Sequence, residues 1–501
     1  MMRRNSSLGS VGFSARGGRS RRRHGGSSKL PYLILIGILI VLLGIAAFLW
    51  VRRSPAEHVS SVPASTETDS ENGVISLDNA SAPADDSLEG VIAQAKLLAD
   101  GYDYDGAINL LSSSTYASDE SVTAAIDEYN ATKETLVRAD PRKVTHVFFH
   151  TLIMDTSKAF DGDSREKGYN QVMTTKDEFM KILQSMYERG FVLVRLHDVA
   201  YEVTAEDGSR YFQEGDIMLP EGKKPFVMSQ DDVCYYEYMD GDGFASRMII
   251  GEDGKPTNEM KMDDGSVSVG SYDLVPLLDD FIKEHPDFSY KGAKAIIALT
   301  GYEGILGYRT ASSYSETPDY ESEKEQAARV AQCLRDDGWE LASHSWGHLW
   351  MGVSDDPENP YKISDERFYT DTDKWKNEVE SLIGPTDIYI YPNGNDVADW
   401  HPYTEENYRY QYLASKGFRY FCNVDASKPA WIQKGPDYLR MARRNLDGYR
   451  LYEDMIQEDP AKKRLSDLFD ASQIFDPSRP TPVTWNYGHT QNETPAPEPE
   501  Q

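Results

Sequence analysis

Segments with strand and helix patterns alternate along the chain from Lys143 onward. The predicted strands cover residues 144–150, 191–194, 225–228, 295–299, 339–342 and 388–391, and the predicted helices cover 176–189, 274–284, 321–337 and 375–383. This order requires parallel strands joined by helices that cover the sheet. We therefore predict an α/β fold, layered or closed into a barrel, whose site lies at the carboxyl ends of the strands.

An uncharged apolar segment, residues 30–51, is long enough to cross roughly 30 Å of hydrocarbon as a helix. The first 53 residues contain no Asp or Glu, and eight Lys or Arg precede the segment whereas two follow it. A cleaved signal peptide would have a shorter apolar core, and a buried core helix is the other alternative. We predict a basic cytoplasmic tail (1–29), a single-pass anchor in the cell membrane (30–51) and an extracellular remainder.

Three shorter regions flank the alternating segments. Residues 52–87 are rich in Ser, Ala, Pro, Asp and Glu, which is typical of a flexible linker. Residues 88–140 have helical periodicity and resemble one tetratricopeptide-like hairpin, which cannot bury its apolar face alone. We expect this hairpin to pack on its neighbour or to self-associate, as a stalk or brace rather than a recognition module. Residues 481–501, with Pro/Glu repeats, are predicted to be a disordered tail.

Charge and cysteine content exclude several classes of protein. The chain has 52 basic and 82 acidic residues, and ten of the basic residues lie in the first 53, so the remainder carries about 40 net negative charges (42 against 82). An acidic surface of this kind disfavours binding to nucleic acid. Three cysteines are too few for a disulfide framework in an exported domain, which must depend on its apolar core.

Two acidic residues and two histidines follow predicted strands. Asp231 and Asp232 come shortly after one strand, and His344 and His348 follow another. Two imidazoles four residues apart on a single helical turn point the same way and can bind one metal ion. We expect them to meet a carboxylate, since the carboxyl ends of parallel strands lie together. Two His and one Asp leave open positions on zinc, which is typical of a catalytic site.

The segments around these residues resemble polysaccharide deacetylases (carbohydrate esterase family four). The resemblance spans about residues 143 to 480 and rests on Pro225–Asp232, Glu340–His348, the early Val147–His150 and the later Tyr391–Gly394. It implies a distorted (β/α) barrel of about seven strands, a divalent metal ion, usually zinc, and hydrolysis of N-acetyl groups on amino-sugar polymers. We therefore expect residues 141–480 to form the catalytic domain.

The resemblance implies distinct roles for the two carboxylates. Asp232 would bind the metal ion together with His344 and His348. Asp231 would act as the general base toward a water molecule. Adjacent carboxylates can divide the work in this way because the charge of the metal ion occupies one of them.

A third motif is expected to contact the substrate. It consists of Tyr391, Pro392, Asn393 and Gly394, and the backbone N–H of Asn393 would help to stabilise the oxyanion. Trp346 is available to stack on a sugar ring, although core packing is the alternative for any single aromatic residue.

Two residues that the resemblance leads one to expect are missing. The family often has an arginine where this chain has Ile390, and we hypothesise that Arg443 or Arg444 supplies the charge that orients the base. The family's late Leu-x-His, whose histidine protonates the departing amine, has no counterpart before the tail. His150, at a predicted strand end, is the candidate for this role, with a plain structural histidine as the alternative.

Together these features predict a membrane-anchored, extracellular, metal-dependent deacetylase of an amino-sugar polymer, such as peptidoglycan or a secreted polysaccharide. An insertion at residues 235–272 could cap or narrow its groove. One alternative is a catalytically degenerate protein that binds glycan in the cell envelope. Another is a metal-dependent hydrolase of a different N-acyl or imide bond, which the same three ligands would permit.

Overall fold

The computed structural model describes residues 86–353, 359 and 361–485. The predicted tail, anchor and most of the linker, and residues 486–501, lie outside the described residues. Within the described residues, none of the helices has both the length and the apolar character required to cross a membrane.

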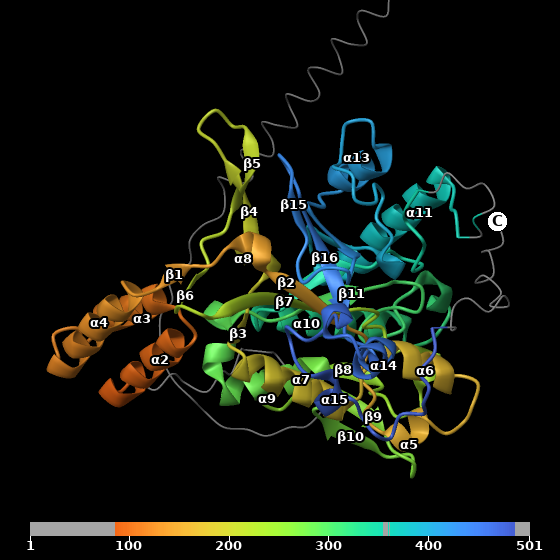
Figure 1. The fold of residues 1–501 in the computed structure, drawn as a ribbon, viewed down its shortest axis with the longest axis horizontal. Coiled ribbons are helices and arrows are strands. Elements are labelled where there is room, and N and C mark those ends of the chain that lie inside the picture. Colours follow the sequence, from red (N-terminus) through yellow and green to blue (C-terminus); the bar gives the residue numbers. More distant parts are fainter. Residues whose placement is uncertain (1–85, 354–358, 360, 486–501) are drawn as a thin grey trace, which may run out of the picture. The chain divides into compact units, whose positions relative to one another are not determined.

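Seven parallel strands close into a barrel (Figure 1). In spatial order they are β2 (Thr145–Phe149), β7 (Lys224–Gln230), β11 (Ile296–Leu299), β12 (Glu340–Ser343), β13 (Ile388–Ile390), β14 (Tyr420–Val424) and β16 (Leu439–Asn445). The barrel is distorted because β7 changes partner along its length. Its first residues pair with β3 (Phe191–Leu193), whereas Ser229 and Gln230 pair with β11. The predicted distorted (β/α) barrel of about seven strands is confirmed.

Alternate side chains of each strand belong to two separate buried clusters. Those that face the surrounding helices, such as Met228 and Leu299, pack with Phe179 and Leu334 of the helices. Their neighbours, such as Val227, fill the barrel interior. This alternation follows from the two-residue repeat of a strand, and it decides which polar residues can face the interior.

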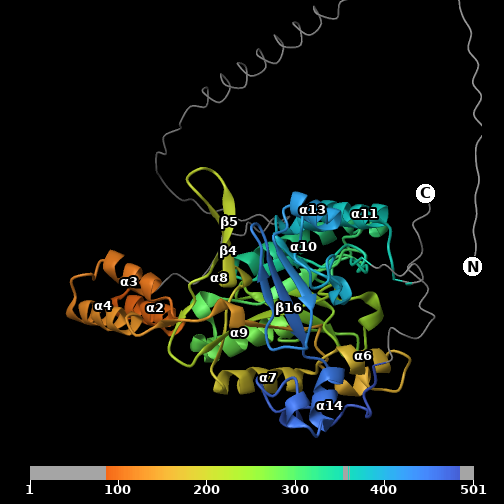
Figure 2. The same cartoon turned by 45° about the horizontal axis from the view of Figure 1, so that its top comes forward.

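Helices cover the outside of the barrel (Figure 2). Helix α7 (Lys176–Glu188) begins with a capping box in which Thr175 and Glu178 satisfy each other's backbone N–H groups. The other helices of the barrel region are α5 (Thr156–Ala159), α6 (Glu166–Val172), α8 (Leu196–Val199), α9 (Leu274–Glu284), α10 (Tyr320–Asp336), α11 (Asp365–Trp375), α12 (Ser381–Ile383), α13 (Tyr408–Ser415), α14 (Gly448–Ile456) and α15 (Ala471–Ile474).

The helix predicted over 375–383 is only partly correct. The α-helix of this region, α11, ends at Trp375, and residues 376–380 form a π-helical turn before α12. Asp371 is buried on the inner side of α11. A polar residue at a buried position interrupts the apolar repeat from which a helix is predicted, so the sequence pattern did not reveal this helix.

Shorter antiparallel strands decorate the barrel. They are β1 (Val137–Arg138) with β6 (Met218–Leu219), β4 (Ala200–Thr204) with β5 (Arg210–Glu214), the sheet of β8 (Arg247–Ile250), β9 (Pro256–Lys261) and β10 (Val267–Gly270), and β15 (Ile432–Lys434) on β16. The sheet β8–β10 lies within the insertion at residues 235–272 that was expected to cap the groove. It packs on α9 and α10, and the residues that reach the site, described below, precede it.

The N-terminal helical segment has three helices rather than the two of a hairpin: α2 (Leu88–Asp100), α3 (Tyr104–Ser113) and α4 (Glu120–Lys133). The turn between α2 and α3 attaches to the barrel domain. There the Tyr102 hydroxyl donates to the Asp287 carbonyl at 2.8 Å, and the Lys291 amide donates to the Gly101 carbonyl at 2.7 Å. Self-association through this segment stays a prediction.

Candidate metal centre

Asp232, His344 and His348 lie together at the carboxyl ends of the strands. One potential ligand atom from each residue lies within 4.8 Å of the others. Asp232 follows β7 by two residues and His344 directly follows β12, as the sequence pattern predicts. The prediction of a helical turn for the two histidines is wrong. Residues 344–350 form an irregular loop in which Ser345 and His348 have left-handed backbone angles (φ 55° and 52°).

Non-glycine residues with left-handed backbone angles concentrate in this region. Asp232 (φ 58°) and Asn393 (φ 56°) join the two residues of the histidine loop. Such conformations cost about 1 kcal/mol or more each, so the surrounding structure must hold them. They turn the chain sharply after a strand, which brings side chains from separate strands to one point.

The two imidazoles present their Nε2 atoms to the carboxylates. The Nδ1–H group of His344 donates to the Ile390 carbonyl at 2.9 Å, which leaves Nε2 as a lone-pair donor. His344 Nε2 lies 3.8 Å from Asp231 Oδ2, and His348 Nε2 lies 3.5 Å from Asp232 Oδ2. Two imidazole nitrogens and one carboxylate oxygen suit zinc and leave further coordination positions open. The residues therefore fit a divalent metal ion.

Asp371 on α11 holds the loop that carries the histidines. Its carboxylate accepts hydrogen bonds from the backbone N–H groups of Trp346 (2.9 Å) and Gly347 (2.7 Å). Burial raises the pKa of Asp371 to about 6. No signal in the sequence identified this residue, because its partners are backbone groups.

Asp231 is an ionised carboxylate between two cationic or potentially cationic groups. Arg443 Nη1 donates to Asp231 Oδ1 at 2.6 Å, and His344 approaches Oδ2. Burial alone would raise the pKa of Asp231, but Arg443 and His344 together hold it well below its ordinary value. The hypothesis that one of the two arginines supplies the missing charge therefore applies to Arg443.

Arg444 has a different position from its neighbour. Successive residues of β16 point to opposite faces, so Arg443 enters the barrel interior and Arg444 faces outward. There Arg444 forms an ion pair with Asp467 at 2.7 Å and also donates to the Thr145 hydroxyl. Its proposed role as a base-orienting residue is wrong for this reason.

Two buried polar side chains, Ser229 and His146, form a hydrogen-bond network with Arg443 in the barrel interior. The Ser229 hydroxyl accepts a hydrogen bond from Arg443 Nη1 at 3.1 Å and lies 3.0 Å from His146 Nε2. Burial lowers the pKa of His146 well below its ordinary value, so its ring is neutral and shares one hydrogen with the Ser229 hydroxyl. Sequence reasoning missed both residues. The available signal was a polar residue at an interior position of two otherwise apolar strands.

His150 follows β2 directly and lies close to both carboxylates. Its Nδ1–H group donates to the Val172 carbonyl at 3.0 Å, so Nε2 is the ring nitrogen left for another partner. When protonated, its charge lowers the pKa of Asp231 and, after the two metal-site histidines, that of Asp232.

The third motif is only partly exposed to a substrate. The Tyr391 ring is buried in the core, and its hydroxyl lies 2.8 Å from that of Tyr403. Pro392 is buried and Asn393 is exposed, in a single turn of 3-10 helix that ends at Gly394. The Asn393 amide lies in the first turn of this helix, where N–H groups lack intrahelical acceptors.

Trp346 has partners within the protein. Its indole N–H donates to Glu378 at 3.0 Å, and the Lys374 ammonium lies 3.4 Å from the ring centroid. A Cβ atom at Gly301 would lie 2.4 Å from the ring, so the glycine permits this packing. These contacts favour the core-packing alternative for Trp346 over stacking on sugar.

No protein-family model and no curated protein sequence matches this chain. Among solved structures, a de-N-acetylase from Aggregatibacter actinomycetemcomitans is 16% identical, covering 61% of this chain and 95% of its own, with a TM-score of 0.33. IcaB from Ammonifex degensii is 15% identical, covering 56% and 83%, with a TM-score of 0.28. Morphinone reductase in complex with tetrahydroNAD is 12% identical, covering 49% and 66%, with a TM-score of 0.18. These superpositions are loose, so the functional argument rests on the side chains of the site.

Proposed function

We propose that this protein is a metal-dependent polysaccharide deacetylase that removes acetyl groups from the nitrogen atoms of an amino-sugar polymer. The observation that carries this proposal is the pair of adjacent carboxylates with separate partners. Asp232 faces His348 within the candidate metal cluster, while Asp231 is fixed by Arg443. One carboxylate is thus available to a cation and the other to a proton.

The geometry supports a division of the reaction among the chain's own groups. A divalent ion held by Asp232, His344 and His348 would polarise the acetamide carbonyl and acidify water. Asp231 then removes the proton as the water oxygen attacks the carbonyl carbon.

Two further groups are proposed to act on the tetrahedral intermediate and on its breakdown. The backbone N–H of Asn393 is proposed to stabilise the negative oxygen of the tetrahedral intermediate, a contact that contributes roughly 3 kcal/mol in other hydrolases. When the carbon–nitrogen bond breaks, the departing sugar amine takes a proton from His150 Nε2. The Nδ1 hydrogen bond to Val172 orients His150 for this step.

The degenerate-binder alternative is disfavoured by the Arg443–Asp231 pair. Both side chains of this pair are almost completely buried, 1% and 3% exposed. Burying an ion pair of this kind has a substantial desolvation cost. A protein that uses the carboxylate as a base has a reason to keep the pair despite this cost, whereas a protein that only binds glycan does not. Hydrolysis of another N-acyl bond remains the second candidate, because the same three ligands and base would serve it.

We further propose that the domain with the metal centre lies on the outer face of a cell membrane. The support for this location is the uncharged segment 30–51, with eight cationic residues before it. Peptidoglycan and secreted polysaccharides are the amino-sugar polymers available there.

Acetate release from N-acetylglucosamine oligomers tests the proposal. We expect the purified protein with Zn²⁺ to release acetate, chelator to abolish release, and Asp231→Asn to lower kcat by roughly 100-fold or more with metal still bound. Metal binding without acetate release from any acetylated glycan would contradict the deacetylase and favour the degenerate binder. Release from simple N-acyl compounds but not from glycans would favour the second candidate.

A further inference from the structure

A buried tyrosine contacts the carboxylate of the candidate metal cluster. The Tyr236 hydroxyl donates to Asp232 Oδ1 at 2.9 Å, while Asp232 Oδ2 is the oxygen that lies 3.5 Å from His348 Nε2. The two oxygens of one carboxylate therefore have different partners. A carboxylate held in this way can offer a single oxygen to a cation in a fixed direction.

A second hydroxyl fixes the direction of the tyrosine proton. Thr300 directly follows β11, and its Oγ1 lies 2.9 Å from the Tyr236 hydroxyl oxygen. An ionised carboxylate only accepts, so Tyr236 donates its single proton to Asp232 and accepts the proton of Thr300. A chain of hydrogen bonds thus runs from the end of one barrel strand to the ligand that follows another.

Aromatic packing prevents the Tyr236 ring from turning away. The ring is stacked on Tyr302 (centroids 5.1 Å apart, 16° between planes) and on Tyr238 (5.6 Å, 11°). Tyr236 is only 6% exposed, and stacked pairs of this kind contribute roughly 1 kcal/mol beyond their buried area. The hydroxyl is therefore held at Asp232 independently of a bound ion.

We infer that Tyr236 is a positioning residue that sets the orientation of Asp232 for metal binding. This inference rests on the proposed function, because it takes Asp232 as a metal ligand. A hydrogen-bond donor to a metal-ligating carboxylate contributes roughly 10- to 100-fold to metal affinity. The Tyr236 hydroxyl is such a donor to Asp232. Its action is on affinity and ligand geometry rather than on the reacting atoms.

Tyr235 provides a matched control on the adjacent residue. Its hydroxyl donates at 2.8 Å to Asp273, a buried carboxylate outside the metal cluster. Tyr235→Phe and Tyr236→Phe each remove one buried hydroxyl that is bonded to a carboxylate. The two variants therefore have similar consequences for folding, and they differ in which carboxylate loses its partner.

Competition with a chromophoric chelator for Zn²⁺, on the purified full chain, tests the inference. We expect Tyr236→Phe to weaken Zn²⁺ binding by roughly 10- to 100-fold and Tyr235→Phe by less than about twofold. In protein loaded with Co²⁺, the visible absorption should change in Tyr236→Phe alone.

Each other outcome has a defined meaning. Equal Zn²⁺ affinity for Tyr236→Phe and wild type would overturn the inference and leave the deacetylase intact. Equal weakening in both variants would also overturn it, since that result indicates a loss of packing. If wild type bound no metal ion, the proposed function itself would fail.

Discussion

Two adjacent arginines on β16 differ in what they contact, and this difference can be tested directly. We expect Arg443→Met to lower kcat by roughly 100-fold or more, because Asp231 loses the cation that keeps it ionised and oriented. Arg444→Met removes a buried arginine of the same strand that pairs with Asp467, so it should destabilise the fold but spare kcat in the folded fraction. Steady-state kinetics normalised to bound metal would distinguish the two. Similar losses in both variants would contradict the role of Arg443.

The proposed proton donor can be separated from a structural histidine by the choice of leaving group. We expect His150→Ala to lower amide hydrolysis by roughly 100-fold or more, since the departing amine must be protonated. A nitrophenyl acetate releases an anion that needs no proton, so its hydrolysis should change far less. Comparison of the two substrates on the same preparation is the measurement. Equal losses on both would favour the structural alternative for His150.

The loop between β12 and α11 illustrates how one helix positions part of a site. We expect Asp371→Asn to weaken metal binding by roughly 10-fold or more, because an amide nitrogen would face a backbone N–H that needs an acceptor. The loss of one acceptor should also lower the free energy of unfolding by about 1–3 kcal/mol. Asp373→Asn on the same helix, where the native carboxylate pairs with Lys416 at the surface, is the control. Metal titration and urea unfolding of both variants provide the comparison.

The sequence was informative about the barrel elements and less informative about the loops. Strand and helix positions such as β2, α7 and α9 agree within one or two residues, because apolar burial repeats with the period of the element. The clustering of Asp232, His344 and His348 could also be predicted, since all three follow strands that end at the same side of the barrel. The Arg443–Asp231 contact spans 212 residues, and it was found only as one of two candidates. The helical turn expected at His344 was wrong because Asp371 stabilises a strained loop that no local pattern encodes.

We expect a second inter-element contact, at the opposite ends of the strands, to make the free energy of unfolding depend on pH. His197 of α8 is hydrogen-bonded to Glu340 at the start of β12 and to Asp387 before β13. Burial disfavours its imidazolium form, but the two carboxylates more than offset this and raise the pKa of His197 to about 10. The stabilisation is complete below the unfolded-state pKa of about 6.5 and is lost as pH rises toward 10. Because the side chain is 39% exposed, solvent screens part of the effect.

His197→Gln tests this contribution. The wild type should lose more stability than the variant between about pH 7 and pH 10, measured as the midpoint of urea unfolding. Groups other than His197 titrate in both proteins, so the difference between the two curves isolates the histidine. Parallel curves over this range would show that the His197 cluster does not contribute to the pH dependence.

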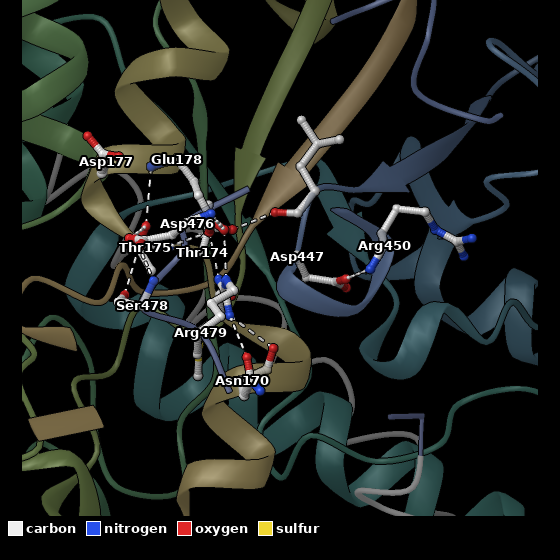
Figure 3. Close-up of polar contacts among 12 residues, drawn as sticks. Asn170, Thr174, Thr175, Asp177, Glu178, Asp447, Arg450, Asp476, Ser478 and Arg479 are labelled. Carbon is white, nitrogen blue, oxygen red and sulfur yellow. Dashed lines mark hydrogen bonds and ion pairs between the residues drawn. The ribbon is translucent and has the colours of Figure 1, made fainter. Parts of the chain in front are cut away.

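The C-terminal segment of the described chain joins distant parts of the molecule through one buried ion pair. Figure 3 shows Arg479 among Asn170, Glu178 and Asp476. Its guanidinium donates to both oxygens of Glu178 at 2.7 and 2.6 Å, and to the Met173 carbonyl at 2.7 Å. Both side chains of the pair are 0% exposed. The residues that follow β16 are thus connected to α6 and α7, which follow the first strand of the barrel.

Removal of one partner should therefore destabilise the whole domain. We expect Arg479→Met to lower the free energy of unfolding by about 3–5 kcal/mol, because it leaves Glu178 buried without a cation. Glu178→Gln combined with Arg479→Met should recover part of that loss, since no charge remains buried. Urea unfolding of wild type, the two single variants and the double variant forms a mutant cycle that isolates the pair. If the two single losses simply added in the double variant, the pair would not be the connection that joins the chain's end to the barrel.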